Sequence, residues 1–232
     1  MIVSAALCPW PPLLVRELTG ADPVLPELRA ACAAAVTALL AAGPELVAVV
    51  GPGPRTARWP ADGRLDVAAF GGGPPGDPAR PVLPPATGIG AYLLDQAGYQ
   101  GPRLVWSVSE DEPASRCAAL GAELAGLGGG QRTGLLVLGD GSARRGPRAP
   151  GYVDGRAAAF DASAERAVRA GDLPALLDLD PGLARELMAT GRPAWQVLAG
   201  ACPGPLRPVH VRYAGDPFGV MYLVASLAPS AP

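Results

Sequence analysis

The stretch Arg132–Asp161, RTGLLVLGDGSARRGPRAPGYVDGRAAAFD, decides the fold that this sequence predicts. It opens with the apolar run Gly134–Leu138 and breaks at Gly139-Asp140-Gly141-Ser142. A short apolar run bounded by turn residues is typical of a strand that is buried on both faces. Open α/β sheets present polar groups at the carboxyl ends of such strands. The stretch therefore predicts a central strand followed by candidate site residues.

Strands and helices alternate on the amino-terminal side of this stretch. Apolar runs that predict buried strands lie at Ile2–Leu7, Leu46–Val50 and Arg103–Val108. Segments with helical spacing lie between or after them, at 24–42, 87–97 and 112–127. This alternation predicts a three-layer α/β/α sandwich around a mixed, mostly parallel central sheet. Residues 55–63 are expected to form a loop, and Leu65–Phe70 a further strand.

The last third of the chain predicts helices and then a hairpin. Helical segments are expected at 154–170, 172–179, 180–189 and 192–201. Two β segments, Val209–Tyr213 and Val220–Ala225, follow with a short connection and predict an antiparallel pair that closes the sheet. We expect one domain over residues 1–232, because a chain of this length can bury a full core.

Composition narrows the class of protein. The net charge is −2, so the chain lacks the basic footprint of a nucleic-acid-binding protein. The absence of a long apolar run argues against a membrane partner, and the start lacks the basic region of a signal peptide, so we expect a cytoplasmic protein. The four cysteines are far apart and form no CxxC motif. We expect buried free thiols, not a zinc or redox site.

Polar groups follow three predicted strands. Trp10 follows the strand at Ile2–Leu7, Gly53 the strand at Leu46–Val50, and Asp140 and Ser142 the strand at Gly134–Leu138, so all of them can meet in one crevice. Arg144 and Arg145 come next and offer planar donors for a carboxylate or phosphate. The alternative interpretation is that Asp140 and Ser142 close a turn or cap a helix and that the arginines lie in solvent.

The chain contains a single histidine, His210, within a predicted strand. A structural role for it is favoured over a role as a base. A two-histidine-one-carboxylate iron site needs more histidines than one chain supplies. A Ser-His-Asp triad with Ser142 and His210 has no nucleophile elbow to support it, and there is no lysine for a phosphate-binding loop.

The order of several short motifs resembles a known family. They are Cys8-Pro9-Trp10-Pro11-Pro12, Val50-Gly51-Pro52-Gly53, the segment 139–145 and the segment 194–201. Over its whole length the chain resembles the class III extradiol ring-cleavage dioxygenases of the protocatechuate 4,5-dioxygenase subunit-B type, in particular a diverged actinobacterial branch. The resemblance implies a mixed sheet flanked by helices, a site at the strand ends, a non-haem ferrous iron and assembly as a homodimer.

The same resemblance shows where this chain departs from the family. The first iron-ligand histidine falls on Trp10, the second on Gly53, and the acid–base histidine near Arg145. Tryptophan and glycine side chains give a metal no donor, so we expect no metal and no cofactor. The expected function is that of a non-catalytic or small-molecule-binding homologue.

The ligand expected for such a homologue is a small aromatic or anionic molecule. Its expected pocket consists of Trp10, Gly53, Asp140, Ser142, Arg144, Arg145 and Tyr152. The candidates for a catalytic role are Asp140, Ser142 and Arg145.

Two enzymatic alternatives stay open at this point. One is an active ring-opening oxidoreductase with an atypical metal site. The other is a metal-free hydrolase or transferase that uses Asp140 and Ser142. Carboxylates for either site are available at Asp66, Glu110, Asp154, Asp161 and Asp216.

Overall fold

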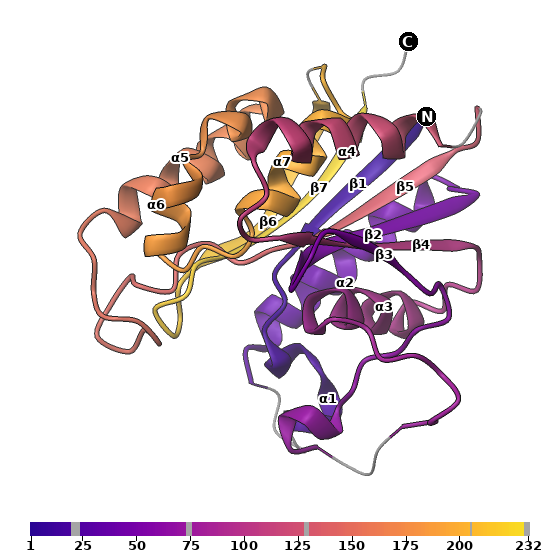
Figure 1. Ribbon diagram of the computed structural model, residues 1–232, viewed down its shortest axis with the longest axis horizontal. Coiled ribbons are helices and arrows are strands. Elements are labelled where there is room, and N and C mark those ends of the chain that lie inside the picture. Colours follow the sequence, from indigo (N-terminus) through magenta and orange to yellow (C-terminus); the bar gives the residue numbers. More distant parts are fainter. Residues whose placement is uncertain (20–23, 73–75, 128–129, 205, 230–232) are drawn as a thin grey trace.

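The computed structural model describes residues 1–19, 24–72, 76–127, 130–204 and 206–229, and its centre is a seven-stranded sheet (Figure 1). The strand order is β3-β4-β2-β5-β1-β7-β6. The four inner strands pair in parallel: β4 (Arg103–Ser109), β2 (Leu46–Gly53), β5 (Thr133–Leu138) and β1 (Ile2–Cys8). The antiparallel strands lie outside them: β3 (Ala57–Trp59) on one side, and β7 (Tyr222–Pro229) and β6 (Leu206–Gly215) on the other.

Helices cover both faces of the sheet (Figure 1). One face carries α2 (Pro26–Ala41) and α3 (Pro85–Gln96), together with the short turns η1 (Pro12–Leu14) and α1 (Arg16–Thr19). The other face carries α4 (Ala114–Gly126), α5 (Ala157–Ala170), η3 (Leu173–Asp178), α6 (Pro181–Glu186) and α7 (Arg192–Ala201). The mixed α/β architecture with helices on both sides, which the sequence predicts, is therefore confirmed.

The opening stretch of sequence explains why the sheet has two cores. In β5, Leu135 and Val137 point into the core beneath α4, α5 and α7, whereas Leu136 and Leu138 point into the core beneath α2 and α3. Successive side chains of a strand alternate between faces, so a strand covered on both sides must be apolar throughout. All of β5 is buried, and its unbroken apolar run follows from this position.

Two local predictions are wrong. Leu65–Phe70 does not form a strand: Leu65 packs into the core beneath α2 and α3, and Ala68–Phe70 forms the 3-10 turn η2. The predicted loop at 55–63 contains β3, which is anchored where the Trp59 indole N–H donates to Ser107 Oγ at 2.7 Å. A strand of three residues is too short to show an alternating pattern.

The cysteines behave as expected, because all four are free and buried. Burial raises the pKa of Cys117 to about 11 and that of Cys202 to about 12. In the part of the chain that the structure describes, no helix combines the length and apolarity needed to cross a bilayer.

Candidate functional site

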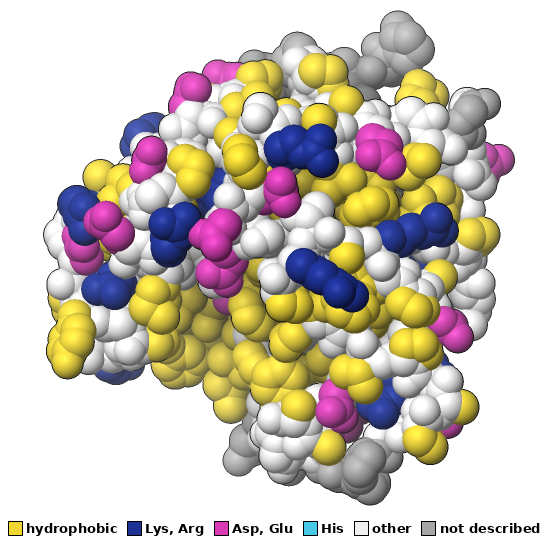
Figure 2. Space-filling model, in the orientation of Figure 1, with side chains coloured by type: hydrophobic (Ala, Val, Ile, Leu, Met, Phe, Trp, Pro, Cys, Tyr) yellow, Lys and Arg dark blue, Asp and Glu magenta, His cyan; other side chains and the backbone are white. Residues whose placement is uncertain are grey.

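A cleft opens at the carboxyl edge of the sheet, where β1, β2 and β4 end. Its volume is about 380 Å³, and it is lined by Trp10, Pro52, Gly53, Pro54, Pro85, Ala86, Ser109, Glu110 and Asp111. The walls are an indole and prolines, and the rim carries two carboxylates. Figure 2 shows that hydrophobic side chains gather in a hollow between the parts of the molecule that carry α6 and α1. The strand-end position expected from the sequence is where the structure has this cleft.

Trp10 is held from both of its ends. Its backbone N–H donates to Asp140 Oδ1 at 2.9 Å, and its indole N–H donates to Thr190 Oγ1 at 3.2 Å. The segment that carries Trp10 is rigid because prolines stand on both sides of it. The indole therefore presents a preorganised aromatic surface to the cleft.

Asp140 contributes to the cleft through Trp10, not by lining it. Its main-chain carbonyl accepts the Gly191 N–H at 2.8 Å, which ties the turn after β5 to the start of α7. Burial raises the pKa of the Asp140 carboxyl to about 7, while the hydrogen bond from the Trp10 N–H opposes this shift. The carboxyl therefore changes its charge near neutral pH, directly behind the aromatic wall.

Ser142 lies in a closed cluster away from the cleft. Its side chain is fully buried, its N–H donates to Asp161 Oδ1 at 2.8 Å, and its hydroxyl donates to Asp161 Oδ2 at 2.5 Å. Arg145 completes the cluster, because it reaches Asp161 Oδ2 at 3.5 Å and Asp216 Oδ2 at 2.9 Å. These contacts fasten the turn after β5 to α5 and to the β6–β7 turn, so Ser142 and Arg145 have structural partners and do not line the expected pocket.

Arg144 and Tyr152 do not line the cleft either. The side chain of Tyr152 is 90% exposed, and the Arg144 carbonyl accepts the Asp154 N–H within the loop that precedes α5. His210 is exposed on β6, at the edge of the sheet. Of the expected pocket, only Trp10 and Gly53 line the cleft, and Asp140 supports it from behind.

At the end of β4, the sequence pointed only to Glu110, as a carboxylate for an enzymatic site, and not to Ser109 or Asp111. Ser109, Glu110 and Asp111 form the polar rim, and the strand-end rule applied to β4 would have found them. Asp111 is paired with Arg185, whose Nη2 lies 2.6 Å from Oδ1.

Arg192 holds this rim in place from the protein interior. Its buried guanidinium donates to the carbonyls of Glu110 and Glu112, the latter at 2.6 Å, and to Gln196 Oε1 at 2.9 Å. Burial lowers the Arg192 pKa. No sequence pattern marks this residue, because its partners are main-chain atoms about 80 positions away.

The residues present do not fit the ferrous iron that the family resemblance implies. The Trp10 indole nitrogen is a donor engaged with Thr190, and it offers no lone pair to a metal. A Cβ added at Gly53 would lie 2.6 Å from the Ser107 Cβ, so this position has no room for a ligand side chain as the backbone stands. Among the described residues, no group of three or more His, Cys, Asp or Glu side chains is placed to hold a metal ion.

Comparisons with known proteins support the class of fold and give no information on the function. No model of a known protein family matches the chain, and no curated protein matches it. Among solved structures, the chain is similar to an uncharacterized protein, JW3007, from Escherichia coli K12. The TM-score is 0.61 at 17% sequence identity, over 97% of this chain and 100% of that chain. The likeness supports the α/β architecture and, at this identity, says nothing about chemistry.

Proposed function

We propose that the protein is a diverged, metal-free relative of the class III extradiol dioxygenases that binds a small aromatic molecule without opening its ring. The observation that carries the proposal is the lining of the cleft at the carboxyl edge of the sheet. It combines the fixed Trp10 indole with prolines and a carboxylate rim, at the strand ends where the family resemblance calls for an iron centre.

The shape and apolarity of the cleft favour an aromatic ligand. Ligand sites combine mostly apolar walls with a few placed polar groups, and aromatic rings stack in offset or edge-on geometry on an indole. The volume of about 380 Å³ has room for a single substituted ring. The hydrogen bond from the indole N–H to Thr190 keeps the stacking surface in one orientation.

The charge of the rim favours a neutral or cationic ligand over an anionic one. Asp111 is paired with Arg185, while Glu110 has no ion pair within the described part of the chain. Arg144 and Arg145, which would attract an anion, do not line the cleft. The Glu110 carboxylate is therefore available to accept hydrogen bonds from a hydroxyl or amino group on the ring.

Calorimetric titration with phenol, tyramine and benzoate tests this proposal. Tyramine is expected to bind most tightly and benzoate least, because of the charge on Glu110. Glu110→Gln should lower the affinity for tyramine about tenfold, because one charge-assisted hydrogen bond is lost. The control Glu123→Gln, on the exposed surface of α4, should leave the affinity for tyramine unchanged. Equal affinity of the wild type and Glu110→Gln for tyramine would refute the assignment.

A second measurement separates binding from ring cleavage. The protein is purified without oxygen, supplied with Fe(II) and mixed with catechols while oxygen uptake is followed. We expect no stoichiometric iron and no catechol-dependent uptake. Tightly held iron together with uptake would establish the oxidoreductase alternative.

The pKa of Asp140 supports a second candidate function, a metal-free enzyme. A carboxyl with a pKa of about 7 can exchange a proton at neutral pH, and the hydrogen bond from the Trp10 N–H places this carboxyl directly behind a residue that lines the cleft. Ser142 is unsuited to serve as its nucleophile, because its hydroxyl already donates to Asp161. If a turnover is found, Asp140→Asn should abolish it while ligand affinity is retained. Unchanged turnover in that variant would exclude this candidate.

A further inference from the structure

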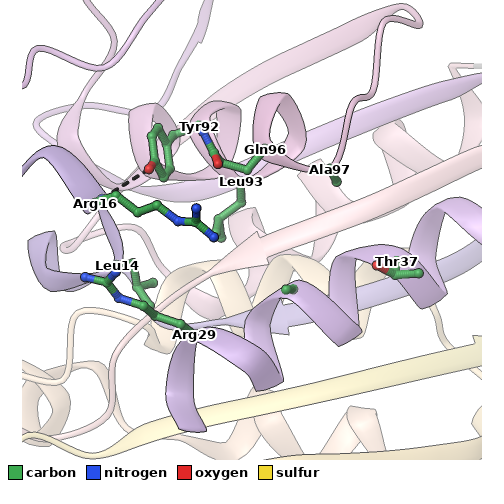
Figure 3. Close-up of a pocket in the computed structure, with 9 residues that line it drawn as sticks. Leu14, Arg16, Arg29, Thr37, Tyr92, Leu93, Gln96 and Ala97 are labelled. Atoms are coloured by element: carbon green, nitrogen blue, oxygen red, sulfur yellow. Dashed lines mark hydrogen bonds between the residues drawn. The ribbon is translucent and has the colours of Figure 1, made fainter. Parts of the chain in front are cut away.

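A second pocket lies on the α2–α3 face of the sheet, and the function proposed above does not use it. It is a cavity of about 200 Å³ between α2, α3 and the η1–α1 segment (Figure 3). From α2 it receives Arg29, Ala33 and Thr37, spaced one helical turn apart. From α3 it receives Tyr92 and Leu93. The pocket is therefore a short groove between two helices.

The η1–α1 segment closes one end of this groove with positive charge. Arg16 extends from α1 so that its guanidinium ends beside Leu93, and Arg29 lies across from it on α2 (Figure 3). Thr37 and Ala97 lie at the opposite end of the groove. The polar end and the apolar middle are thus separated along its length.

The two arginines have different degrees of freedom. Arg29 is anchored, because its Nε donates to the Leu13 carbonyl at 3.1 Å and its Nη2 to Thr19 Oγ1 at 2.5 Å. The side chain of Arg16 makes no ion pair among the described residues. The guanidinium of Arg16 can therefore reorient to pair with a ligand, while Arg29 supplies a positive charge at a fixed position.

Tyr92 links the mouth of the groove to α1. Its hydroxyl accepts the Arg16 N–H at 3.1 Å and donates to Glu17 Oε2 at 3.1 Å. Burial is the main cause of the raised pKa of Tyr92, so the hydroxyl stays protonated at neutral pH. Two guanidinium groups and one carboxylate leave a single excess positive charge at this end.

We propose that this groove binds a small monocarboxylate with a short apolar body. The carboxylate pairs with the Arg16 guanidinium near Arg29, and the body lies against Leu14, Ala33 and Leu93. Guanidinium and carboxylate match in a planar, two-bond geometry, which gives this pair specificity as well as strength. One excess charge suits a monoanion better than a phosphate dianion, and the small volume limits the body to a few carbons.

Calorimetry with hexanoate, and with hexanol as the uncharged probe of equal length, tests this proposal. Hexanoate should bind and hexanol should bind at least tenfold more weakly. Arg16→Met should reduce hexanoate affinity about tenfold or more, whereas Arg116→Met on the exposed surface of α4 should not alter it. Equal affinity of the two probes, or an unchanged affinity in Arg16→Met, would overturn the proposal. Arg16 is chosen because Arg29 also supports the main chain at Leu13.

A second variant tests the apolar half of the site. Ala33→Leu narrows the groove without changing its charge and should lower the affinity for hexanoate at least tenfold. Ala122→Leu, on the surface of α4, is the matched control. Competition of inorganic phosphate with hexanoate at equal or higher affinity would show an unselective anion site and would also overturn the proposal. Trp10→Ala should leave hexanoate affinity unchanged, so failure here is distinguishable from failure of the cleft at the sheet edge.

Discussion

The turn after β5 and the loop after β4 end neighbouring parts of the same sheet edge, yet one is closed and the other is open. In the turn Gly139–Ser142, the Gly141 N–H donates to the Met221 carbonyl and the Met221 N–H donates to the Ser142 carbonyl. In the loop after β4, Ser109 and Glu110 border a cleft. The difference comes from position: β5 lies at the middle of the sheet and its turn is bonded to α5 and to the residues just before α7 and β7, whereas β4 lies beside the short edge strand β3.

The glycines of the closed turn serve packing and not a ligand. A Cβ added at Gly139 would lie 2.6 Å from the Gly191 Cα, and one at Gly141 would lie 2.7 Å from Asp161 Oδ1. Both distances are shorter than real Cβ contacts. A Gly-x-Gly-Ser sequence after a buried strand can therefore mark close approach of other elements as readily as an active-site turn.

The largest effect that tests this comparison is expected at Asp161. Asp161→Ala leaves the buried Ser142 hydroxyl and N–H without an acceptor, and it removes a partner of Arg145. We expect a loss of about 3–5 kcal/mol in the free energy of unfolding, measured by urea denaturation. The matched change Asp111→Ala breaks an exposed ion pair at the open loop and should cost less than about 1 kcal/mol. Similar losses in both variants would remove the distinction between the two regions.

A smaller effect is expected from filling the closed turn. Gly139→Ala forces the new methyl group against the backbone of Gly191 and should destabilise the protein by about 1–3 kcal/mol. Gly146→Ala is the control, because nothing lies within 4 Å of a Cβ at that position. Thermal and urea unfolding measure both. A stability of Gly139→Ala equal to that of the wild type would show that the turn is looser than its packing indicates.

The pH dependence of stability sharpens the comparison at Asp140, which belongs to the closed turn but accepts the N–H of Trp10 in the wall of the cleft. The unfolded carboxyl ionises near 3.8 and the folded one near 7, so the folded state keeps its proton over this window. The stability of the wild type relative to Asp140→Asn should therefore fall as pH rises from about 4 to about 7, by about 4 kcal/mol, and stay level above that. Urea unfolding of both proteins across this range measures it. A difference that does not vary with pH would contradict the raised pKa.

The smallest effect on stability is expected in the open cleft. Trp10→Phe removes the indole N–H bond to Thr190 and part of a half-buried aromatic surface, and it should cost about 0.5–1 kcal/mol in the free energy of unfolding. The same change should measurably lower the affinity for aromatic ligands in calorimetric titration, because the side chain at position 10 loses both stacking area and its fixed orientation. Tyr152→Phe, at a 90% exposed position, is the control for both measurements. A large stability loss with unchanged ligand affinity would show that Trp10 is a core residue instead of a binding surface.

Local patterns in the sequence were sufficient for most of the fold. The predicted helix 192–201 coincides with α7, and the apolar runs at Ile2–Leu7 and Leu46–Val50 lie within β1 and β2. These elements are long enough for their burial to leave a clear pattern. The strand predicted at Leu65–Phe70 is wrong because Leu65 is buried in a coil and Val67 and Phe70 are only partly buried around a 3-10 turn, where no regular spacing is needed.

The candidate site could be predicted only in part. The strand-end rule led to Trp10 and Gly53, which line the cleft. It also led to Ser142 and Arg145, which are instead bound to Asp161. The rule depends on the order of strands in the sheet and on what covers each end, and neither is encoded within a short motif.

The sequence by itself determined a doubly covered sheet, because an unbroken apolar run such as Gly134–Leu138 is stable only between two apolar layers. It also determined where polar groups leave the sheet, because Gly, Pro and Asp end those runs. Tertiary structure alone decided which of these ends is open. Asp161, 19 residues beyond Ser142, and Arg192, about 80 residues beyond the loop that it holds, satisfy buried polar groups that no local pattern relates to them. Unpaired buried polar groups are costly, so the partners supplied by distant segments determine whether a strand end becomes a site or part of the core.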